Sequence, residues 1–167
     1  MPSVRISKEM NSAIYYLTFT VRNWYYIFDR HNRFQILANT LKYCQEHKGV
    51  ELYGYVFMLN HIHLVGSAPD MIGFVRDFKK FTSRELQKNI IATEPGVLSL
   101  FDTGDGRCEF WAKTNMPKMI ETEKFLVQKI GYVHANPVRK QYVKRSEDWV
   151  WSSANPESEI VVVPVPI

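Results

Sequence analysis

The stretch FMLNHIHLVGSA, residues 57–68, predicts the end of one strand, a tight turn at Asn60 and a second strand directly after it. Side chains alternate across a strand, so His61 and His63 share one face while apolar side chains occupy the other. The chain has five histidines, and two of them lie together on this mostly apolar strand. The sequence therefore predicts a β-hairpin that carries two histidines on one face of its second strand.

The segments around this hairpin alternate between strand and helix patterns. In chain order, the sequence predicts a strand at 13–21, a helix at 34–47, strands at 50–59 and 61–68, a helix at 70–90, a loop at 93–108, a strand at 109–114 and a helix from Pro117 to about Ala135. The strand at 50–59 is apolar on both faces, which favours a central place in the sheet. Asn136-Pro137 is expected to end the last helix, because a residue before proline avoids the helical region. The prolines of the tail limit it to a sheet edge.

The order strand, helix, strand, strand, helix, strand indicates the fold class. It predicts an α+β fold, a ferredoxin-like split βαβ sandwich in which helices pack on an antiparallel sheet. At 167 residues, the chain has the length of one domain with a substantial core.

The composition is that of an ordinary soluble globular protein, with 46% apolar and 23% charged residues. A net charge of +4 permits a polyanionic partner but does not require one. Cys44 and Cys108 lack metal-site spacing, which favours free thiols in a reducing compartment. The sequence shows neither a secretion signal nor the ~20 apolar residues of a membrane helix, so we expect a cytoplasmic protein.

Two patterns point to chemistry at the histidine pair and in the last helix. Two imidazoles on one strand face can share a divalent ion if a third group arrives from elsewhere. The alternative is two unconnected histidines with ordinary hydrogen bonds. Tyr132 and Asn136, four residues apart, share a helix face that is separate from the apolar stripe. Tyr132 is either a nucleophile toward phosphorus or a tyrosine at the rim of the core, with Asn136 as a helix cap.

The predicted helix at 70–90 carries a row of positive side chains. Four of them recur every four residues and a fifth flanks them: Arg76, Lys80, Arg84, Lys88 and Lys79. A cationic stripe can follow a phosphate backbone. The alternative is a solvated helix face, and Asp77 and Glu85 dilute its charge.

Four stretches together resemble the single-tyrosine, histidine-hydrophobe-histidine (HUH) transposases of the insertion-sequence type, most closely the REP-associated tyrosine transposases. They are YVFMLNHIHLVG (55–66), similar to the family's metal-binding strand pair; DFKKFTSRELQK (77–88), similar to its basic helix; YVHANPVRK (132–140), similar to its nucleophile segment; and EDWVWSSA (147–154), similar to its C-terminal signature. The resemblance covers about residues 13–154 and leaves 155–167 as a tail. It implies one HUH transposase domain over 1–167.

This resemblance implies an enzyme that nicks and rejoins single-stranded DNA near hairpins through a 5′-phosphotyrosine intermediate. Tyr132 would be the nucleophile, and the metal, Mg²⁺ or Mn²⁺, would be held by His61, His63 and Asn136. The five cationic side chains of the 70–90 helix would bind DNA. The chain would act as a monomer or a homodimer, and the sequence does not choose between them.

The sequence departs from the family pattern at a few positions. Leu59 stands where proline is frequent, Gly131 stands where a larger residue is usual, and the residues after NPV differ. None of these changes removes a catalytic group. Three other functions stay open: a domesticated hairpin-binding protein that no longer cuts, a replication-type HUH nickase, and a metal-binding protein with no role on DNA.

Overall fold

Four strands form one antiparallel sheet in the computed structural model, which describes residues 5–165. The strands are β1 (Ile14–Thr20), β2 (Glu51–Phe57), β3 (His61–Ser67) and β4 (Lys118–Ile120), in the order β2-β3-β1-β4. The helices are α1 (Arg33–His47), α2 (Met71–Thr93) and α3 (Glu123–Arg139). This order confirms the predicted ferredoxin-like α+β fold.

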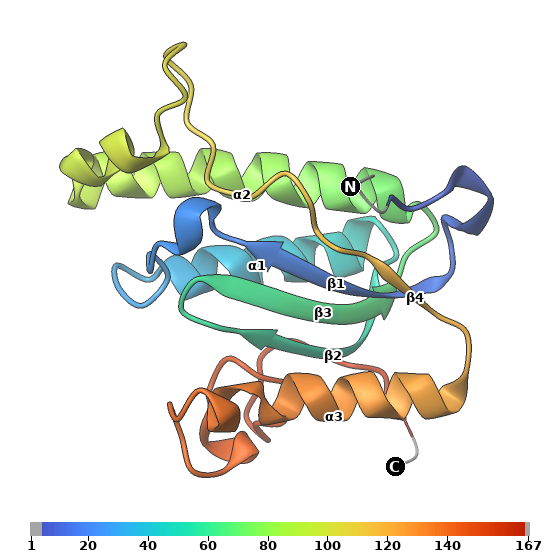
Figure 1. Cartoon of the computed structure of the whole chain (residues 1–167). Coiled ribbons are helices and arrows are strands. Elements are labelled where there is room, and N and C mark those ends of the chain that lie inside the picture. Colours follow the sequence, from blue (N-terminus) through green and yellow to red (C-terminus); the bar gives the residue numbers. More distant parts are fainter. Residues whose placement is uncertain (1–4, 166–167) are drawn as a thin grey trace.

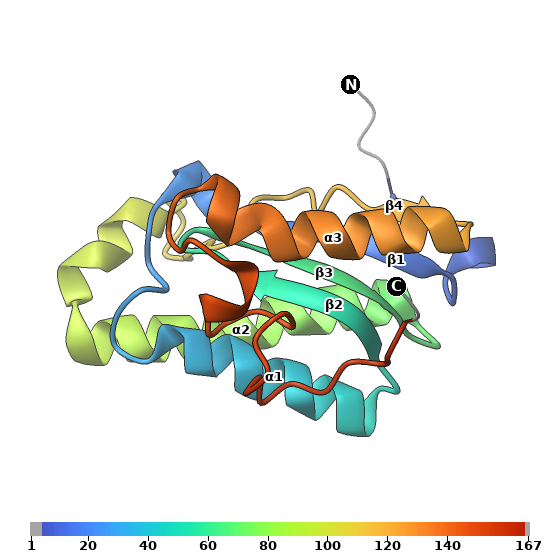
Figure 2. The ribbon, with the colours of Figure 1, turned by 90° about the horizontal axis from the view of Figure 1, so that it is seen from below.

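The sheet separates two layers of helices. Helices α1 and α2 cover one face, and α3 crosses the other (Figures 1 and 2). Each face has its own hydrophobic cluster because strand side chains alternate. On β3, Ile62 and Leu64 belong to the larger cluster with α1 and α2, whereas Val65 belongs to the α3 cluster. His61 and His63 have the parity of Val65, so they face the α3 layer.

Strand β2 lies at the end of the strand order, so its predicted central place is wrong. Its free edge is instead covered by the C-terminal segment. Phe57 N–H donates to the Trp151 carbonyl at 2.8 Å, and Val163 N–H donates to the Leu52 carbonyl at 2.7 Å. Figure 2 shows this segment running beside β2. Strand β2 is apolar on both faces because its side chains enter both hydrophobic clusters, and the covered edge agrees with the edge position expected for the tail.

The strand predicted at 109–114 is also wrong. Trp111 makes only an isolated bridge to Val21, and regular pairing with β1 begins at Lys118. Met116 has a φ of 44°, which bends the chain between the two contacts. The preceding segment, predicted as a loop at 93–108, contains a short 3₁₀ helix at Pro95–Phe101.

Helix α3 begins later and ends later than predicted. Thr122 is its N-cap, and its side chain accepts a hydrogen bond from Phe125 N–H at 3.1 Å. Pro137 lies inside the last turn instead of ending the helix. Its carbonyl accepts from Tyr142 N–H at 2.9 Å, so the chain stays hydrogen-bonded past the proline. Burial of Pro137 and the two turns before it offsets the preference of a pre-proline residue for extended backbone.

Among the described residues, 5–165, no helix is both long enough and apolar enough to cross a membrane.

Candidate active site

The two histidines of β3 lie against each other on the α3 side of the sheet. His61 is 8% exposed and His63 is 6% exposed, and their ring centroids are 4.8 Å apart. The rings meet edge to face at 77°. The structure therefore brings the predicted pair together in one nearly buried position, instead of leaving two separate imidazoles.

Hydrogen bonding fixes which nitrogen of His61 carries the proton. Asn60 Nδ2 donates to the Trp24 carbonyl at 3.1 Å, which orients the amide so that its oxygen faces His61. That oxygen can only accept, so His61 Nδ1 at 2.8 Å is the donor. Nε2 is then the nitrogen with a free lone pair, which is the form that binds a metal.

His63 has a comparable outer shell. Its Nδ1 lies 3.0 Å from Tyr16 Oη and 3.0 Å from Thr18 Oγ1, and either hydroxyl oxygen can accept a hydrogen bond from Nδ1–H. Burial lowers the pKa of His63 to about 3, and the charges of His61, Arg139 and Lys129 add to the effect. Burial, with the charge of Lys140, lowers the pKa of His61 to about 4. Both imidazoles are therefore neutral at pH 7, as metal ligands must be.

Tyr132 lies beside this pair, at the surface of α3. Its ring is 6.1 Å from that of His63 and 6.2 Å from that of Tyr16, centroid to centroid. Its side chain is 45% exposed, outside both hydrophobic clusters. The phenol is therefore accessible from solvent, next to the histidines and against Tyr16 of the α3 cluster, a position that fits both the nucleophile and a tyrosine at the rim of the core.

Asn136 lies one turn after Tyr132, on the buried side of α3. It is not a helix cap, because the helix continues to Arg139 and Lys140 occupies the C-cap position. Arg139 and Lys140 act electrostatically on His63 and His61, so this end of α3 lies near the histidine pair.

Two cations lie over the Tyr132 ring, and neither is among the predicted site residues. The guanidinium carbon of Arg139 lies 4.0 Å from the centroid of the Tyr132 ring, and Lys129 Nζ lies 5.3 Å from it. Arg139 also donates to the Tyr132 carbonyl at 2.9 Å. The signal was available in the sequence, because positions 129, 132, 136 and 139 recur at helical spacing.

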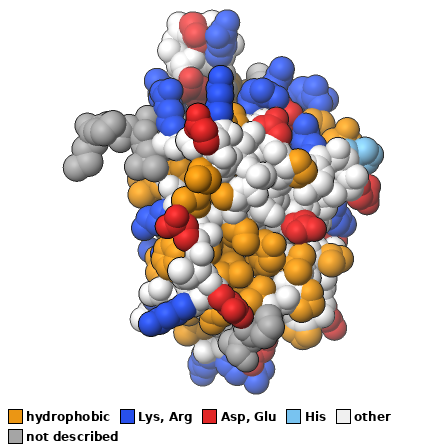
Figure 3. Space-filling model, turned by 90° about the vertical axis from the view of Figure 1, so that its right-hand side faces the viewer, with side chains coloured by type: hydrophobic (Ala, Val, Ile, Leu, Met, Phe, Trp, Pro, Cys, Tyr) orange, Lys and Arg blue, Asp and Glu red, His pale blue; other side chains and the backbone are white. Residues whose placement is uncertain are grey.

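The predicted basic stripe lies on the other layer. Arg76, Lys80, Arg84 and Lys88 are exposed on α2, across the sheet from the histidines. Lys79 differs from them, because its ammonium donates to the carbonyls of Ala112 and Lys113. In Figure 3, lysine and arginine side chains gather mainly at the top, the level of α2, and at the bottom, the level of α3, with a hydrophobic area and a few acidic side chains between. The structure does not bring this stripe into the site.

The donor set around the pair suits a metal that accepts few protein ligands. Within residues 5–165, no group of three or more His, Cys, Asp or Glu side chains could hold an ion. Two neutral imidazoles, with the amide oxygen of Asn136 as the predicted third ligand, would leave coordination positions for oxygen atoms of a substrate and for water. The chemistry of these residues therefore fits a weakly held divalent ion, not a closed structural site.

Comparisons with known proteins bear on the fold and the family of the chain. No curated protein matches the chain. A solved structure described as a REP-associated tyrosine transposase bound to a REP hairpin is similar in fold, with a TM-score of 0.70 and 17% identity over 92% of this chain and 82% of that one. The family model described as "Transposase IS200 like" matches residues 9–97, just over half of the chain, which include β3 but not α3. The chain belongs to the IS200-like transposase family.

Proposed function

We propose that this chain cuts and rejoins single-stranded DNA near a hairpin, with Tyr132 as the nucleophile and a divalent cation as cofactor. The observation that carries the proposal is the position of Tyr132, an exposed phenol whose ring lies 6.1 Å from that of a buried, neutral histidine. The fold and the family membership support it. The proposed unit of function is one HUH-type domain, residues 1–167.

The proposed metal ligands are His61 and His63 through Nε2, with Asn136 as a third ligand. The hydrogen bonds at Nδ1 of both rings support this choice, because they leave the other nitrogen for a metal. Mg²⁺ and Mn²⁺ are the candidates, and Mn²⁺ accepts imidazole more readily. A divalent ion bound here would polarise the oxygens of the scissile phosphate as a Lewis acid.

The phenol oxygen of Tyr132 attacks phosphorus and releases its proton to solvent. One bond forms, between the phenol oxygen and phosphorus, and one bond breaks, between phosphorus and the 3′-oxygen, which leaves as a hydroxyl after taking up a proton. The 5′ end is then joined to the protein as a phosphotyrosine. Attack by another 3′-hydroxyl reverses the exchange and rejoins DNA without ATP, because each step replaces one phosphate ester with another.

Lys129 and Arg139 are proposed to hold the phosphate against Tyr132. Both cations lie over the Tyr132 ring, so a phosphate bound beside the phenol would meet them with its oxygens, where negative charge gathers during attack. The stripe of Arg76, Lys80, Arg84 and Lys88, with Lys79, stays a proposed contact for DNA outside the cleavage site. Hairpin DNA is proposed as the partner because the similar solved structure is bound to a hairpin.

The deciding experiment uses single strands with a hairpin from the DNA that flanks the gene, labelled at either end, with Mg²⁺ or Mn²⁺. Denaturing gels compare the parent protein with Tyr132→Phe and with His61→Ala/His63→Ala. Tyr43→Phe is the matched control, since Tyr43 is also an exposed tyrosine but lies on α1. The expected result is a protein-linked 5′ end that persists in Tyr43→Phe and disappears in the other variants.

A covalent product in Tyr132→Phe would contradict the assignment of the nucleophile. Tight hairpin binding with no covalent product from the parent protein, with either metal, would favour the domesticated binder instead. Cleavage of plasmid-origin sequences but not of the flanking hairpins would favour a replication-type nickase.

A further inference from the structure

Trp24 is a large aromatic side chain at the surface beside the histidine pair. It is 65% exposed, and its ring centroid lies 6.4 Å from that of His61, edge to face. Exposed tryptophan carries apolar area that water solvates poorly. Trp24 lies next to His61, a proposed metal ligand, but has no role in the proposed cleavage steps.

The backbone around Trp24 is held in an unfavourable conformation. Asn23 and Trp24 have φ angles of 59° and 61°, in the left-handed region that bulky residues avoid. Such a conformation persists only where surrounding contacts hold it, and it is enriched at functional sites. Here Trp24 N–H donates to the Val21 carbonyl at 2.9 Å, and Asn60 Nδ2 donates to the Trp24 carbonyl at 3.1 Å.

Asn60 connects this conformation to the proposed metal ligand. One amide group binds the Trp24 carbonyl through its nitrogen and His61 Nδ1 through its oxygen. The contact that holds the tryptophan is thus the contact that orients the imidazole. The indole ring and the lone pair of His61 Nε2 are positioned together.

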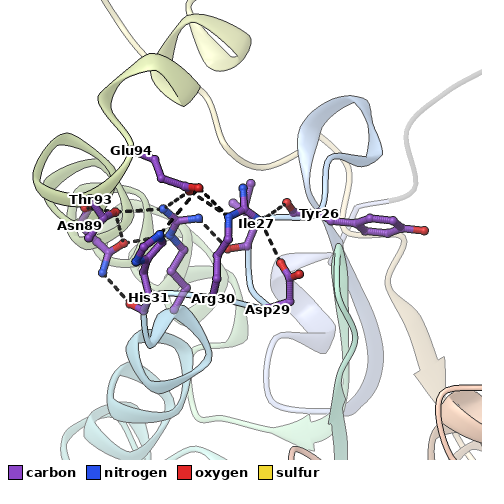
Figure 4. Close-up of polar contacts among 9 residues, drawn as sticks. Tyr26, Ile27, Asp29, Arg30, His31, Asn89, Thr93 and Glu94 are labelled. Carbon is purple, nitrogen blue, oxygen red and sulfur yellow. Dashed lines mark hydrogen bonds and ion pairs between the residues drawn. The ribbon is translucent and has the colours of Figure 1, made fainter.

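The loop that follows Trp24 is anchored from the opposite layer. Arg33, which is fully buried, donates to the Ile27 carbonyl at 3.0 Å and to Glu94 at 2.8 Å. Arg30 donates to the Tyr26 carbonyl at 2.9 Å and also to Glu94 (Figure 4). The Tyr26 ring points away from this network and is 57% exposed. The loop is therefore preorganised, and it presents two aromatic rings to solvent.

We propose that Trp24 is a stacking platform for an unpaired base next to the scissile phosphate. An indole face accepts any base, and stacking requires a base that is not already paired and stacked in a duplex. The cations Lys129 and Arg139 at Tyr132 supply the attraction for phosphate that accompanies aromatic platforms in single-strand sites. The inference rests on the proposed function for the location of the phosphate, but binding tests it separately from cleavage.

The test measures binding of a short single strand that carries aminopurine beside the cleavage position, in a Tyr132→Phe background that cannot react. The key variant is Trp24→Gly, because glycine adopts a positive φ without strain while it removes the ring. Trp24→Phe keeps an aromatic face. Tyr43→Ala is the matched control, an exposed aromatic residue on the other layer.

Trp24→Gly is expected to be at least as heat-stable as the parent and to bind the strand roughly 5- to 150-fold more weakly. Trp24→Phe should recover most of the affinity, Tyr43→Ala should not change it, and aminopurine quenching should be lost only with the ring.

Unchanged affinity and quenching in Trp24→Gly would overturn the inference, as would a change in oligomeric state with unchanged DNA binding. If the parent forms no covalent product but its binding depends on Trp24, the proposed function fails and the platform stands. If Trp24→Gly binds like its Tyr132→Phe background, and Trp24→Gly with Tyr132 intact cleaves like the parent, the platform alone fails.

Discussion

A single residue, Asn60, determines which nitrogen of His61 carries the proton. Its amide fixes His61 with the proton on Nδ1, and no other residue in the hairpin turn could bind both a carbonyl and an imidazole in this way. Outer-shell partners of this kind set the orientation and basicity of a metal-binding histidine. The sequence presents Asn60 only as a turn residue, and the structure adds this second contact.

Removing the Asn60 amide is expected to weaken metal binding. Asn60→Ala should lower the affinity for Mn²⁺ roughly 10- to 100-fold, the usual effect of losing an outer-shell partner. Titration calorimetry of the parent and the variant measures this directly, without a cleavage assay. Asn39→Ala, on the exposed side of α1, is the control and should bind Mn²⁺ like the parent. Equal affinity in Asn60→Ala would count against His61 as a ligand.

The sequence predicts some site residues well and others not at all, for physical reasons. His61 and His63 share a strand face by parity alone, and Tyr132 lies off the apolar stripe of its helix, so local spacing suffices for both. Trp24 cannot be selected in this way. Its exposure depends on a left-handed backbone held by Asn60, which is 36 residues away in the sequence.

The strands and helices also differ in how well the sequence alone predicts their positions. The strands and helices with continuous apolar patterns were predicted to within a few residues, because their own side chains form the core. Strand β4 was misplaced because it spans three residues, and its position depends on where the chain meets β1. The end of α3 was misplaced because Pro137 is accommodated by tertiary burial, which a local rule cannot include.

Two glycines should respond to alanine in opposite directions. A Cβ at Gly131 on α3 meets nothing within 4 Å among the described residues, so Gly131→Ala should stabilise the protein by roughly 0.5–1 kcal/mol. A Cβ at Gly73 on α2 would lie 2.2 Å from Oδ2 of the N-cap Asp70, so Gly73→Ala should destabilise it by about 0.5–2 kcal/mol. Urea unfolding measures both. A destabilised Gly131→Ala would indicate that α3 needs a hinge there.

The network that joins α1 to α2 should make stability depend on acid pH. Hydrogen bonds from Arg30 and then Arg33 lower the pKa of Glu94 to about 2, below its ordinary 4.5. A lowered pKa in the folded state stabilises the protein above pH 4.5, and this contribution is lost as the pH falls toward 2. Glu94→Gln should therefore unfold at a lower temperature than the parent at pH 7. The difference should shrink between about pH 4.5 and pH 2, as followed by circular dichroism. A difference independent of pH would show that the charge of Glu94 is not what matters.

At the scale of the whole molecule, the sheet divides the positive charge between two layers. Lys129 and Arg139 lie with Tyr132 on α3, while Arg84 and its neighbours lie on α2. A strand cut at Tyr132 and a hairpin held on α2 would have to contact opposite faces of one molecule, or the two faces of different copies. Because the two groups of cations lie on opposite sides of the sheet, mutating each group separately shows which face the DNA contacts.

The salt dependence of hairpin binding should distinguish the two basic faces. Each phosphate contact removed from duplex DNA flattens the slope of log affinity against log salt by about 0.9, so the loss of two contacts changes it by about 2. If α2 holds the hairpin stem, Arg84→Ala/Lys88→Ala flattens the slope for a blunt hairpin and leaves the covalent joining of a bare single strand intact. Lys129→Ala/Arg139→Ala should do the reverse, weakening attack on the single strand more than binding of the stem. Equal slopes for the parent and the α2 variant would place the stem elsewhere. The stripe on α2 would then be a solvated helix face. Part of its positive charge is already paired within the helix, because Asp77 forms an ion pair with Arg76, and Glu85 forms ion pairs with Arg84 and Lys88.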